Sequence, residues 1–331
     1  MLEGKKILFI SPAFFNYEKD IKNKLESFGA KVDFYDERPS NEVLSKALLR
    51  VSKKFVRSSI KKHYDHIFNE IKDKEYDFFF LIKGEATPAY FLQQFRDINT
   101  RTRFIYYSYD SVANNTNAVS NLRYFDVSYS FDDHDTSFIE GLKFRPLFYL
   151  DEYAKESKSD AKFDVSFIGT VHSDRYHTVN NLVEEIERKL QKPLRKYLFF
   201  YCQSILYFYF RRLTDKNFKG VKKSDISFAP MPKKDIFKVF DESKCVIDIH
   251  HPNQTGLTMR TIEAIGAKKK IITTNERIRE YDFFSPANIM IIDRKKPVVD
   301  IAFFDTPYQS IDEAIYRKYS IGCWISEIFE N

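Results

Sequence analysis

The chain has 331 residues, which is too long for one ordinary α/β domain and suits two domains of roughly 150 residues each. With 43% hydrophobic and 30% charged residues, the composition is that of a globular protein and excludes a disordered or fibrous one. Three cysteines, Cys202, Cys245 and Cys323, lie far apart without a CxxC pair, which indicates neither a zinc site nor a disulfide framework and fits a reducing compartment.

The net charge of +6 is small, but its distribution is uneven, because residues 46–62 contain seven basic residues and no acidic one. Such a stretch is typical either of a solvated helix face or of a surface that contacts anionic lipid or nucleic acid. The first eleven residues run from two lysines directly into a strand-like IleLeuPheIle run, without the long apolar segment of a secretory signal. We therefore expect a cytoplasmic protein, and peripheral association with the inner face of the cell membrane stays open.

The first half of the chain alternates short apolar runs with helical patterns. Strands are predicted over residues 6–11, 31–35, 77–82, 103–108 and 124–130, and a helix over residues 17–28 that ends before Gly29. Strands that alternate with helices indicate a parallel sheet covered on both faces. Residues 1–150 are therefore predicted to form a Rossmann-like domain.

A second alternating series follows an interruption at residues 147–162, where the pattern gives way to a polar linker. Strands are predicted over residues 164–168, 226–229, 245–249, 270–273 and 289–292, and helices over residues 176–190, 234–242 and 257–267. This series predicts a second Rossmann-like domain over residues 151–310. A final helix is expected over residues 311–329, within a C-terminal segment 311–331.

Residues 197–210 are apolar and aromatic and are bracketed by basic residues. The segment is shorter than the roughly 20 residues that a membrane span needs, and Gln203 and Ser204 interrupt it. It fits either a buried core helix or a helix that lies at a membrane interface or faces a substrate.

The most informative region is residues 226–275. Neither GxGxxG after the first strand nor GxxxxGK[ST] occurs, so the sequence signals of dinucleotide redox and P-loop chemistry are missing. Gly256 allows a close approach of the backbone to a ligand, and the free N–H groups of the helix that starts at Leu257 favour a diphosphate. Arg260 adds a cation one turn in, and Glu263 is placed to accept from ribose hydroxyls.

Residues 255–264 align without a gap with the E-G-F-G-x-x-x-x-E-A motif of group 1 GT-B glycosyltransferases, so this region resembles their C-terminal domain. Thr255 departs from the motif, which has a glutamate there. The resemblance implies a GT-B fold, in which two Rossmann-like domains have parallel sheets facing a central cleft. It also implies a transferase that uses a nucleoside-diphosphate sugar, and we expect this donor to be UDP-linked. Residues 163–293 are also similar to glycosyltransferases of bacterial lipopolysaccharide and capsule clusters, and TyrAspPhePhe at 281–284 adds to this similarity.

The same resemblance suggests which residues bind the donor. The segment that ends in Gly169 and Thr170, with Arg175 beyond it, resembles the loop that holds the distal phosphate, and residues 228–231 stand where the family's backbone meets the base. The implied donor-site residues are Gly169, Thr170, His172, Arg175, Pro230, Met231, His250, Thr255, Gly256, Leu257, Thr258, Arg260 and Glu263. For His172, an exposed loop position fits equally well, and for His250 and His251 a structural role is the alternative.

Two carboxylates in the first half are candidates for acid–base chemistry. Glu85 follows one buried strand, and Asp110 follows the next. An inverting transfer needs a carboxylate or imidazole to deprotonate the acceptor hydroxyl, and we rank Asp110 slightly ahead of Glu85 as that base. The alternative is that each carboxylate only caps the next helix.

No metal and no other cofactor is expected, because Arg260, Arg175 and the helix start would neutralise the leaving diphosphate. Residues 132–135 contain the Asp-x-Asp that metal-dependent GT-A transferases use, but they follow a strand and open a helix, which favours an N-cap. His63 and His66 have ligand-like spacing on a helix and are expected to be exposed.

The expected partners are a nucleotide-sugar donor and a surface-polysaccharide or lipopolysaccharide acceptor, which a lipid could carry. One alternative keeps the fold but changes the reaction to that of a nucleotide-sugar epimerase or hydrolase. The other is a non-catalytic nucleic-acid-binding protein, suggested by the basic stretch and the 17% aromatic content. Against it, the aromatic residues fall mainly in apolar strand runs rather than between lysines and arginines.

Overall fold

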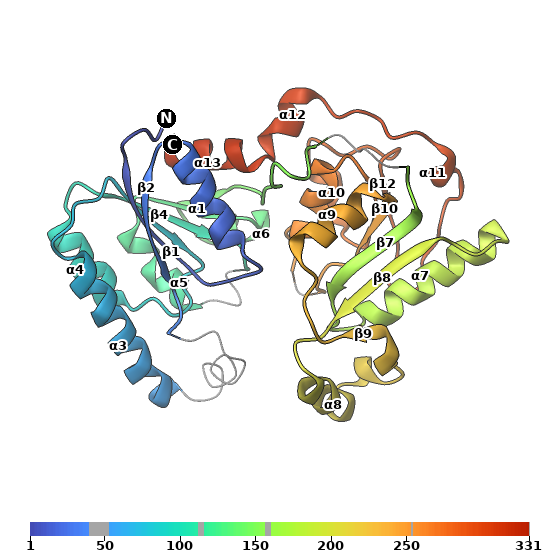
Figure 1. Cartoon of the computed structure of the whole chain (residues 1–331), viewed down its shortest axis with the longest axis horizontal. Coiled ribbons are helices and arrows are strands. Elements are labelled where there is room, and N and C mark those ends of the chain that lie inside the picture. Colours follow the sequence, from blue (N-terminus) through green and yellow to red (C-terminus); the bar gives the residue numbers. More distant parts are fainter. Residues whose placement is uncertain (40–52, 112–115, 156–159, 253, 331) are drawn as a thin grey trace. The chain divides into compact units, whose positions relative to one another are not determined.

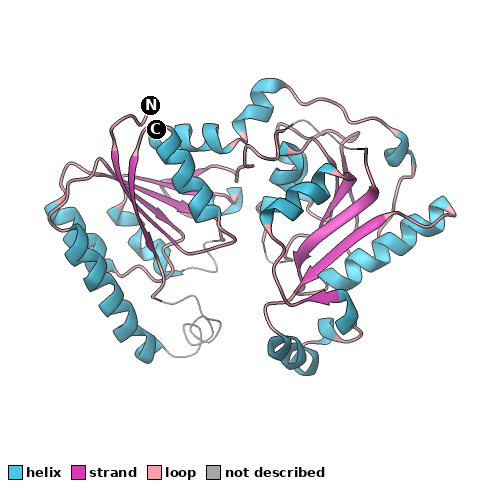
Figure 2. Ribbon diagram, viewed as in Figure 1, coloured by secondary structure: helices cyan, strands magenta, loops and turns pink. Residues whose placement is uncertain are grey.

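The computed structural model describes residues 1–39, 53–111, 116–155, 160–252 and 254–330. The chain divides into two compact units, which we call unit 1 (Met1–Pro146 with Ile321–Asn331) and unit 2 (Leu147–Ser320). Each unit contains a six-stranded sheet with helices packed on it (Figures 1 and 2). All paired strands in both sheets are parallel, so the prediction of two Rossmann-like α/β domains is confirmed.

Unit 1 has the strand order β2-β1-β3-β4-β5-β6. Its strands are β1 (Lys6–Ser11), β2 (Lys31–Asp36), β3 (Phe78–Ile82), β4 (Arg103–Ser108), β5 (Val127–Ser130) and β6 (Leu142–Phe144). Its helices are α1 (Tyr17–Ser27), α3 (Lys53–Ile71), α4 (Ala89–Ile98), α5 (Thr116–Asn121), α6 (Asp133–Thr136) and α13 (Ile321–Glu330). The short strand β6 was not predicted, because three residues are too few to show a period.

Alternate side chains of the unit 1 strands bury two different cores, as the pleat of a strand requires. Leu8 and Ile10 of β1 face a cluster that includes Tyr64 of α3 and Phe91 of α4. On the other face, Phe9 stacks against Phe80 with ring centroids 5.2 Å apart. Helices on both faces explain why these strands are continuously apolar in sequence.

The C-terminal helix α13 completes the second face of the unit 1 sheet. Trp324 is fully buried there, with its ring centroid 4.8 Å from that of Tyr107. The buried Arg145 binds Glu327 at 2.8 Å. The segment expected as one helix over 311–329 is therefore two helices, α12 (Glu313–Lys318) in unit 2 and α13 in unit 1. The helix breaks at Tyr319, whose carbonyl accepts from the N–H of Tyr149 at 2.8 Å.

Unit 2 has the strand order β12-β11-β10-β7-β8-β9. Its strands are β7 (Phe163–Thr170), β8 (Lys196–Tyr201), β9 (Ile226–Ser227), β10 (Ser243–Asp248), β11 (Lys270–Thr273) and β12 (Ile289–Ile291). Its helices are α7 (Arg175–Leu190), α8 (Ile205–Thr214), α9 (Lys233–Asp241), α10 (Met259–Gly266), α11 (Ala302–Asp305) and α12. Val165 and Phe167 of β7 pack with Val179 and Leu182 of α7 in the main core of this unit.

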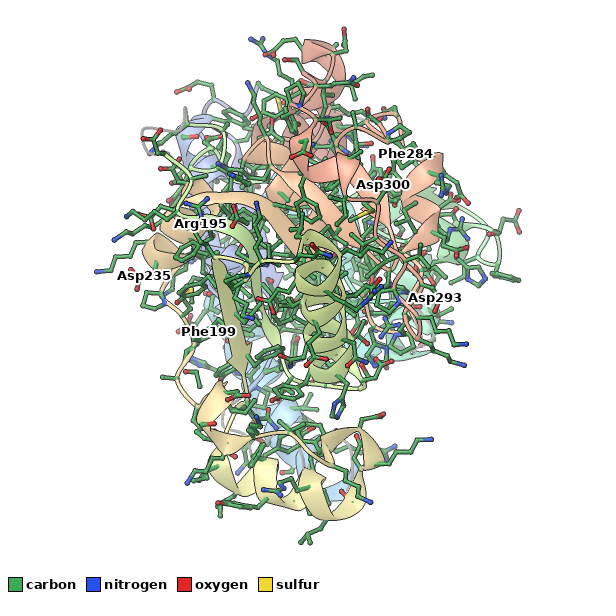
Figure 3. All side chains as sticks on the ribbon, turned by 90° about the vertical axis from the view of Figure 1, so that its right-hand side faces the viewer. Arg195, Phe199, Asp235, Phe284, Asp293 and Asp300 are labelled. Atoms are coloured by element: carbon green, nitrogen blue, oxygen red, sulfur yellow. The ribbon has the colours of Figure 1, made fainter. Side chains whose placement is uncertain are left out.

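The apolar segment 197–210 is not one helix. Its first part belongs to β8, which pairs with β7 from Lys196 to Tyr201, and Phe199 lies on this strand in Figure 3. The chain then leaves the sheet, and Ser204 caps α8 by accepting from the N–H of Tyr207 at 3.1 Å. In a run of apolar residues, periodicity alone does not distinguish a buried strand from a buried helix. This run contains one strand and one helix.

The basic stretch is only partly within the described residues. Lys46 and Arg50 lie outside them, whereas Arg57, Lys61 and Lys62 are exposed on α3. Among the helices that the structure describes, none has the length and apolar character needed to cross a bilayer.

The packing of Tyr149 on α10 gives a test of unit 2. A Cβ atom on Gly266 would lie 2.4 Å from Cγ of Tyr149, closer than any normal contact. We expect Gly266→Ala to lower the free energy of unfolding by about 1–3 kcal/mol, as overpacking does, in urea unfolding followed by circular dichroism. The matched helical control is Gly322→Ala, whose Cβ would lie 3.5 Å from the flexible Lys24 side chain and 3.7 Å from the Phe28 ring, both ordinary contacts. If both variants unfold at the same urea concentration, the close packing on Gly266 is wrong.

Candidate functional site

In unit 2, the order of strands reverses between β7 and β10. The chain moves outward from β7 through β8 and β9, and then returns to β10 on the other side of β7 and moves outward through β11 and β12. Parallel sheets bind ligands at the carboxyl ends of strands beside such a reversal. The residues that follow β7 and β10 therefore form the candidate donor site.

Histidines from both strand ends meet at this place. The rings of His172, after β7, and His251, after β10, have centroids 5.1 Å apart. The Nδ1 atom of His250 lies 2.8 Å from the hydroxyl of Thr274, which follows β11. The structure thus brings together three strand ends that are far apart in the sequence.

Burial and neighbouring arginines lower the pKa values of two of these histidines. Burial, followed by the charge of Arg175, lowers the pKa of His172 to about 3. Burial, followed by the charge of Arg294, lowers the pKa of His250 to about 4. Both imidazoles are therefore neutral at pH 7 and add no positive charge to that of the arginines beside them.

Two arginines link the strand ends. Arg175 donates from Nε to the carbonyl of Ile249 at 2.8 Å and from Nη1 to the carbonyl of Thr170 at 3.1 Å. Burial lowers the pKa of Arg175 to about 10, although the nearby carboxylate of Asp248 opposes this shift. Arg294 binds Asp174 at 2.5 Å and also donates to the carbonyl of His250.

The loop before α10 is held by side chains of β10 and β11. Asp248 accepts from the hydroxyls of Thr258 at 2.8 Å and Thr261 at 2.5 Å, and Thr258 caps α10 by accepting from the N–H of Thr261. Asn275 donates to the carbonyl of Thr255 at 3.0 Å. These bonds fix the start of α10 at the edge of the sheet where the arginines lie.

Glu263 occupies a different environment from the one expected for an open ribose site. It is only 2% exposed, and it binds Arg260 on its own helix at 2.6 Å. The Arg260 guanidinium lies 5.1 Å from the centroid of Phe240. Burial and the charge of Glu263 together raise the pKa of the neighbouring Tyr153 well above its ordinary value. A ribose at Glu263 would add to or replace the bond from Arg260.

The remaining donor-site candidates lie in different environments. A Cβ on Gly169 would lie 2.7 Å from the Phe167 ring and 3.3 Å from Nη1 of Arg175, so the site has no room for a side chain there. Leu257 is buried, with 2% of its surface exposed. Pro230 and Met231 follow β9, which lies two strands from β7 and hence about 10 Å away. The strand order therefore separates them from the histidine and arginine group.

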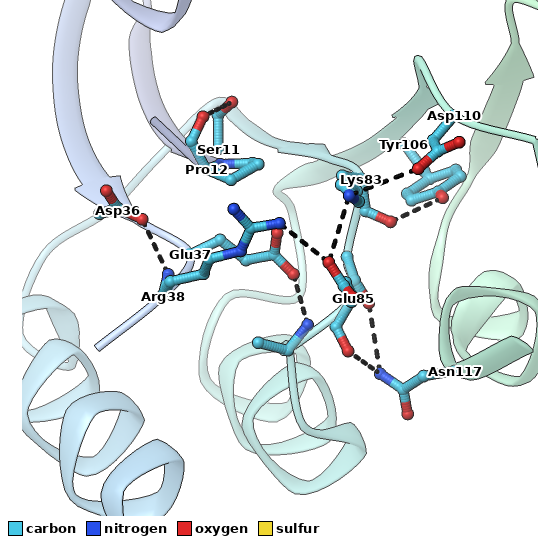
Figure 4. Close-up of polar contacts among 12 residues, drawn as sticks. Ser11, Pro12, Asp36, Glu37, Arg38, Lys83, Glu85, Tyr106, Asp110 and Asn117 are labelled. Atoms are coloured by element: carbon cyan, nitrogen blue, oxygen red, sulfur yellow. Dashed lines mark hydrogen bonds and ion pairs between the residues drawn. The ribbon is translucent and has the colours of Figure 1, made fainter. Parts of the chain in front are cut away.

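In unit 1, a polar cluster lies at the carboxyl ends of β1 to β4 (Figure 4). The Nζ atom of Lys83 lies 3.2 Å from a carboxylate oxygen of Glu85 and 3.4 Å from one of Asp110. Arg38 binds the same Glu85 oxygen at 2.9 Å. The structure thus brings the two predicted acid–base candidates together, with two cations between and beside them.

The backbone of this cluster is strained at one position. Lys83 has a φ of 74° and Gly84 a φ of 66°, a left-handed conformation that is unfavourable for lysine but not for glycine. Hydrogen bonds hold it: the N–H of Lys83 donates to Tyr107 at 2.9 Å, and the Tyr106 hydroxyl donates to the Lys83 carbonyl at 2.9 Å.

The ion pairs affect which carboxyl can act as a base. Burial alone would raise the pKa of Glu85, but Lys83 and Arg38 lower it below the ordinary value. Glu85 is therefore a carboxylate at pH 7 with little tendency to take a proton. Asp110, whose carboxylate lies 3.4 Å from Nζ of Lys83, is the other predicted candidate.

Glu37, which follows β2, was not predicted from the sequence to be a site residue. It is fully buried, its Oε1 accepts from the N–H of Ala86 at 2.6 Å, and its Oε2 has no hydrogen-bond partner. Burial raises its pKa to about 7, and the charges of Arg38 and Lys83 limit the rise. In sequence, Asp36-Glu37-Arg38 reads as a charged turn, and no signal in it distinguishes the fully buried carboxyl from its half-buried neighbours.

The possible metal motifs have structural roles. Asp132 caps α6 by accepting from the N–H of His134 at 3.1 Å, so the N-cap prediction is confirmed. Asp135 is buried and accepts from the hydroxyl of Ser130 at 2.8 Å. His66 is exposed as predicted, but His63 is half-buried, and its Nε2 lies 2.8 Å from the Asp36 carbonyl. Within the described residues, no group of three or more His, Cys, Asp or Glu residues could hold a metal ion.

Sequence comparison finds no matching family model and no matching curated protein. Solved structures, in contrast, match nearly the whole chain. Anabaena HepE, solved in complex with UDP and glucose, is 14% identical and has a TM-score of 0.60, with 98% of each chain covered. Sucrose-phosphate synthase from Thermosynechococcus elongatus is 8% identical and has a TM-score of 0.58, again with 98% of each chain covered.

A third similar structure is an epimerase. UDP-GlcNAc 2-epimerase from Methanocaldococcus jannaschii is 11% identical and has a TM-score of 0.55, covering 98% of this chain and 100% of its own. At such identities the matches establish the fold alone. The chain has the GT-B fold, as the resemblance at residues 255–264 implied.

The pKa of Glu37 predicts a pH-dependent stability of unit 1. The native carboxyl titrates at about 7 and the unfolded one at its ordinary value near 4.5. The stabilisation from the neutral native form is fully present below pH 4.5 and is lost as the pH rises through 7, a change of about 3 kcal/mol. Glu37→Gln removes the ionisation, so we expect this variant to gain about 3 kcal/mol over the wild type between pH 5 and pH 8.

The measurement is urea unfolding followed by fluorescence of Trp324, the single tryptophan, which is buried in unit 1. The control is Glu140→Gln, which changes an exposed glutamate of the same unit and should show no such pH-dependent gain. Equal pH dependence of wild type and Glu37→Gln would mean that Glu37 is already ionised in the native protein.

Proposed function

We propose that the protein is a glycosyltransferase that moves a sugar from a UDP-linked donor to a surface-polysaccharide or lipopolysaccharide acceptor. The observation that carries the proposal is the group of cations at the β7 and β10 ends of a GT-B fold. The charges of Arg294 and Arg260 both act on Arg175 there, although Arg294 is paired with Asp174 and Arg260 with Glu263. A diphosphate is the anion that such a group and a helix start together would bind.

In this proposal the diphosphate lies against Gly256 and the start of α10. The Arg175 guanidinium donates to two carbonyl groups, which carry no net charge, so these two contacts do not neutralise it. His172 lies beside it as a neutral imidazole that can donate one hydrogen bond to a phosphate or sugar oxygen. The nucleoside would extend along α10 towards Glu263.

The transfer itself needs a group that accepts the proton of the acceptor hydroxyl. The hydroxyl oxygen bonds to the anomeric carbon, the bond from that carbon to the diphosphate breaks, and the diphosphate leaves as an anion. We propose Asp110 as the proton acceptor, with Glu85 second because its two cations keep it ionised. The arginines take the part of a metal by neutralising the leaving group.

The second candidate function is that of a nucleotide-sugar epimerase or hydrolase. It is favoured by the similarity of the fold to UDP-GlcNAc 2-epimerase over 98% of this chain. The two functions differ in their need for an acceptor. Release or epimerisation of the sugar without any added glycan would favour the second function, whereas turnover that depends on the glycan supports transfer.

The donor site predicts the effect of Glu263→Gln on nucleotide binding. The amide keeps the size of the side chain but removes its charge and one acceptor, so a ribose hydroxyl would bind less well. We expect UDP to bind at least about tenfold more weakly, as calorimetry would measure, which corresponds to about 1.4 kcal/mol. The control is Glu184→Gln, an exposed change on α7 that should leave the affinity unchanged.

Loss of the Arg260–Glu263 ion pair could also unsettle α10, so the thermal transition of each variant is measured alongside. If Glu263→Gln unfolds like the wild type and binds UDP with the same affinity, Glu263 does not contact the ribose.

The proposal also predicts that turnover persists in EDTA. Arginine side chains and the α10 start would neutralise the diphosphate, so removal of divalent ions should change the rate less than about twofold. The rate is measured with the same donor and acceptor before and after chelation. Loss of turnover that manganese restores would contradict metal independence.

Acceptors of this class are often carried by lipids, so we propose that the protein works in the cytoplasm at the inner face of the membrane. Support for this proposal comes from the exposed basic residues Arg57, Lys61 and Lys62 of α3.

A further inference from the structure

Helix α8 presents a continuous apolar face to solvent. Leu206 is 80% exposed, Phe210 60% and Leu213 88%. Ile205 and Tyr209 are also exposed. The spacing of these five residues, at i, i+1, i+4, i+5 and i+8, places all of them on one side of the helix.

The opposite side of α8 is fixed to unit 2, so the apolar face cannot turn inward. Phe208 is fully buried, and its ring packs against those of Phe218 at 6.3 Å and Phe228 at 5.9 Å. The guanidinium of Arg211 donates to the hydroxyl of Tyr207 at 2.7 Å. Figure 3 shows α8 beyond the end of the strand that carries Phe199, at one end of the unit.

Positive charge surrounds the apolar face. Residues 205–223 contain six basic residues and one acidic residue, Asp215, which gives a net charge of +5. Asp215 is bound by Arg211, so it does not offset the other cations at the surface. The exposed cations are Arg212, Lys216, Lys219, Lys222 and Lys223.

We infer that this surface, residues 205–223, which we call the α8 surface, docks on an anionic lipid bilayer. Leu206, Phe210 and Leu213 would enter the boundary between headgroups and acyl chains, and the surrounding lysines would lie among the anionic headgroups. At ten residues, α8 is suited to lie in this boundary and not to cross it. A second copy of the chain is a poorer occupant, because two α8 surfaces would each bring a charge of +5 to the contact.

Docking on a bilayer does not depend on the proposed transfer reaction. Its effect on access to the acceptor does depend on that reaction. Helix α8 begins at Ile205, four residues after β8 ends, and β8 pairs in parallel with β7. The α8 surface therefore follows the edge of the sheet that carries the carboxyl ends of β7 and β8. If the proposed function holds, docking would bring the donor site close to a lipid-linked acceptor.

The test is co-sedimentation of the full chain with vesicles of phosphatidylcholine alone or mixed with phosphatidylglycerol, at low salt and at about 0.15 M salt. We expect binding to the anionic vesicles, weakened by salt, and little binding to the neutral ones. A variant with Leu206→Gln, Phe210→Gln and Leu213→Gln should bind at least about tenfold more weakly, because glutamine keeps the helix but not the apolar contact. The matched control is Val298→Gln, which removes an apolar side chain that is 73% exposed elsewhere in unit 2.

The charge is tested separately with Lys216→Gln, Lys219→Gln and Lys223→Gln, which should reduce binding to anionic vesicles and its salt dependence. A variant with Arg57→Gln, Lys61→Gln and Lys62→Gln probes α3 instead and should lose less binding than the apolar triple variant does. Circular dichroism and the thermal transition verify that each variant folds. These measurements need no donor or acceptor, so they stand whether or not the transfer reaction is found.

Three outcomes would overturn the inference. The first is equal vesicle binding of the wild type and the apolar triple variant. The second is binding that ignores lipid charge, or that only the α3 variant abolishes. The third is a wild-type dimer in sedimentation velocity that the apolar triple variant converts to a monomer, because a second copy would then cover the α8 surface.

Discussion

The chain leaves β7 and β10 in opposite directions, and the charged groups of unit 2 are arranged around these two strand ends. Arg175 joins the ends through the carbonyls of Thr170 and Ile249, and so a cation is held in a largely buried place by dipoles. Burial, followed by the charge of Arg175, lowers the pKa of the neighbouring His172 to about 3 and keeps this imidazole neutral. An anion at this place would be stabilised by groups that are already positioned, without reorganisation at the time of binding.

In unit 1, cations and carboxylates form a cluster of ion pairs at the carboxyl ends of the strands. Lys83 and Arg38 are matched by Glu85 and Asp110, and the cluster is held on a backbone whose left-handed lysine costs roughly 1 kcal/mol. Beneath the cluster, Glu37 binds the N–H of Ala86 just after Glu85. The ionisation of the buried Glu37 is thus coupled to the position of the loop that carries Glu85.

Much of the fold could be predicted from the sequence, because buried parallel strands are short apolar runs that end in polar turns. The start of α10 could also be found, since Gly256 and the Thr258 cap are local features. The pairing of His172 with His251 could not, because it depends on strand order, which no local pattern reports. The burial of Glu37 and the ion pair of Glu263 were equally hidden, since both depend on what the fold packs against those carboxylates.

The segment around α8 illustrates where composition alone misleads. Its apolar residues suggested one element, but those of β8 are partly covered by the sheet, whereas those of α8 largely remain in water. Phe208, together with the partly buried Tyr207, attaches the helix to the core of unit 2, and the exposed apolar residues on the other side of α8 are not part of that core. Exposed leucines at 206 and 213 gain no folding energy from their apolar surface, and a cationic rim around them does not improve packing either. The fold therefore accounts for the presence of α8 but not for the composition of its outer face, and a surface that is both apolar and anionic is the environment in which that composition becomes favourable.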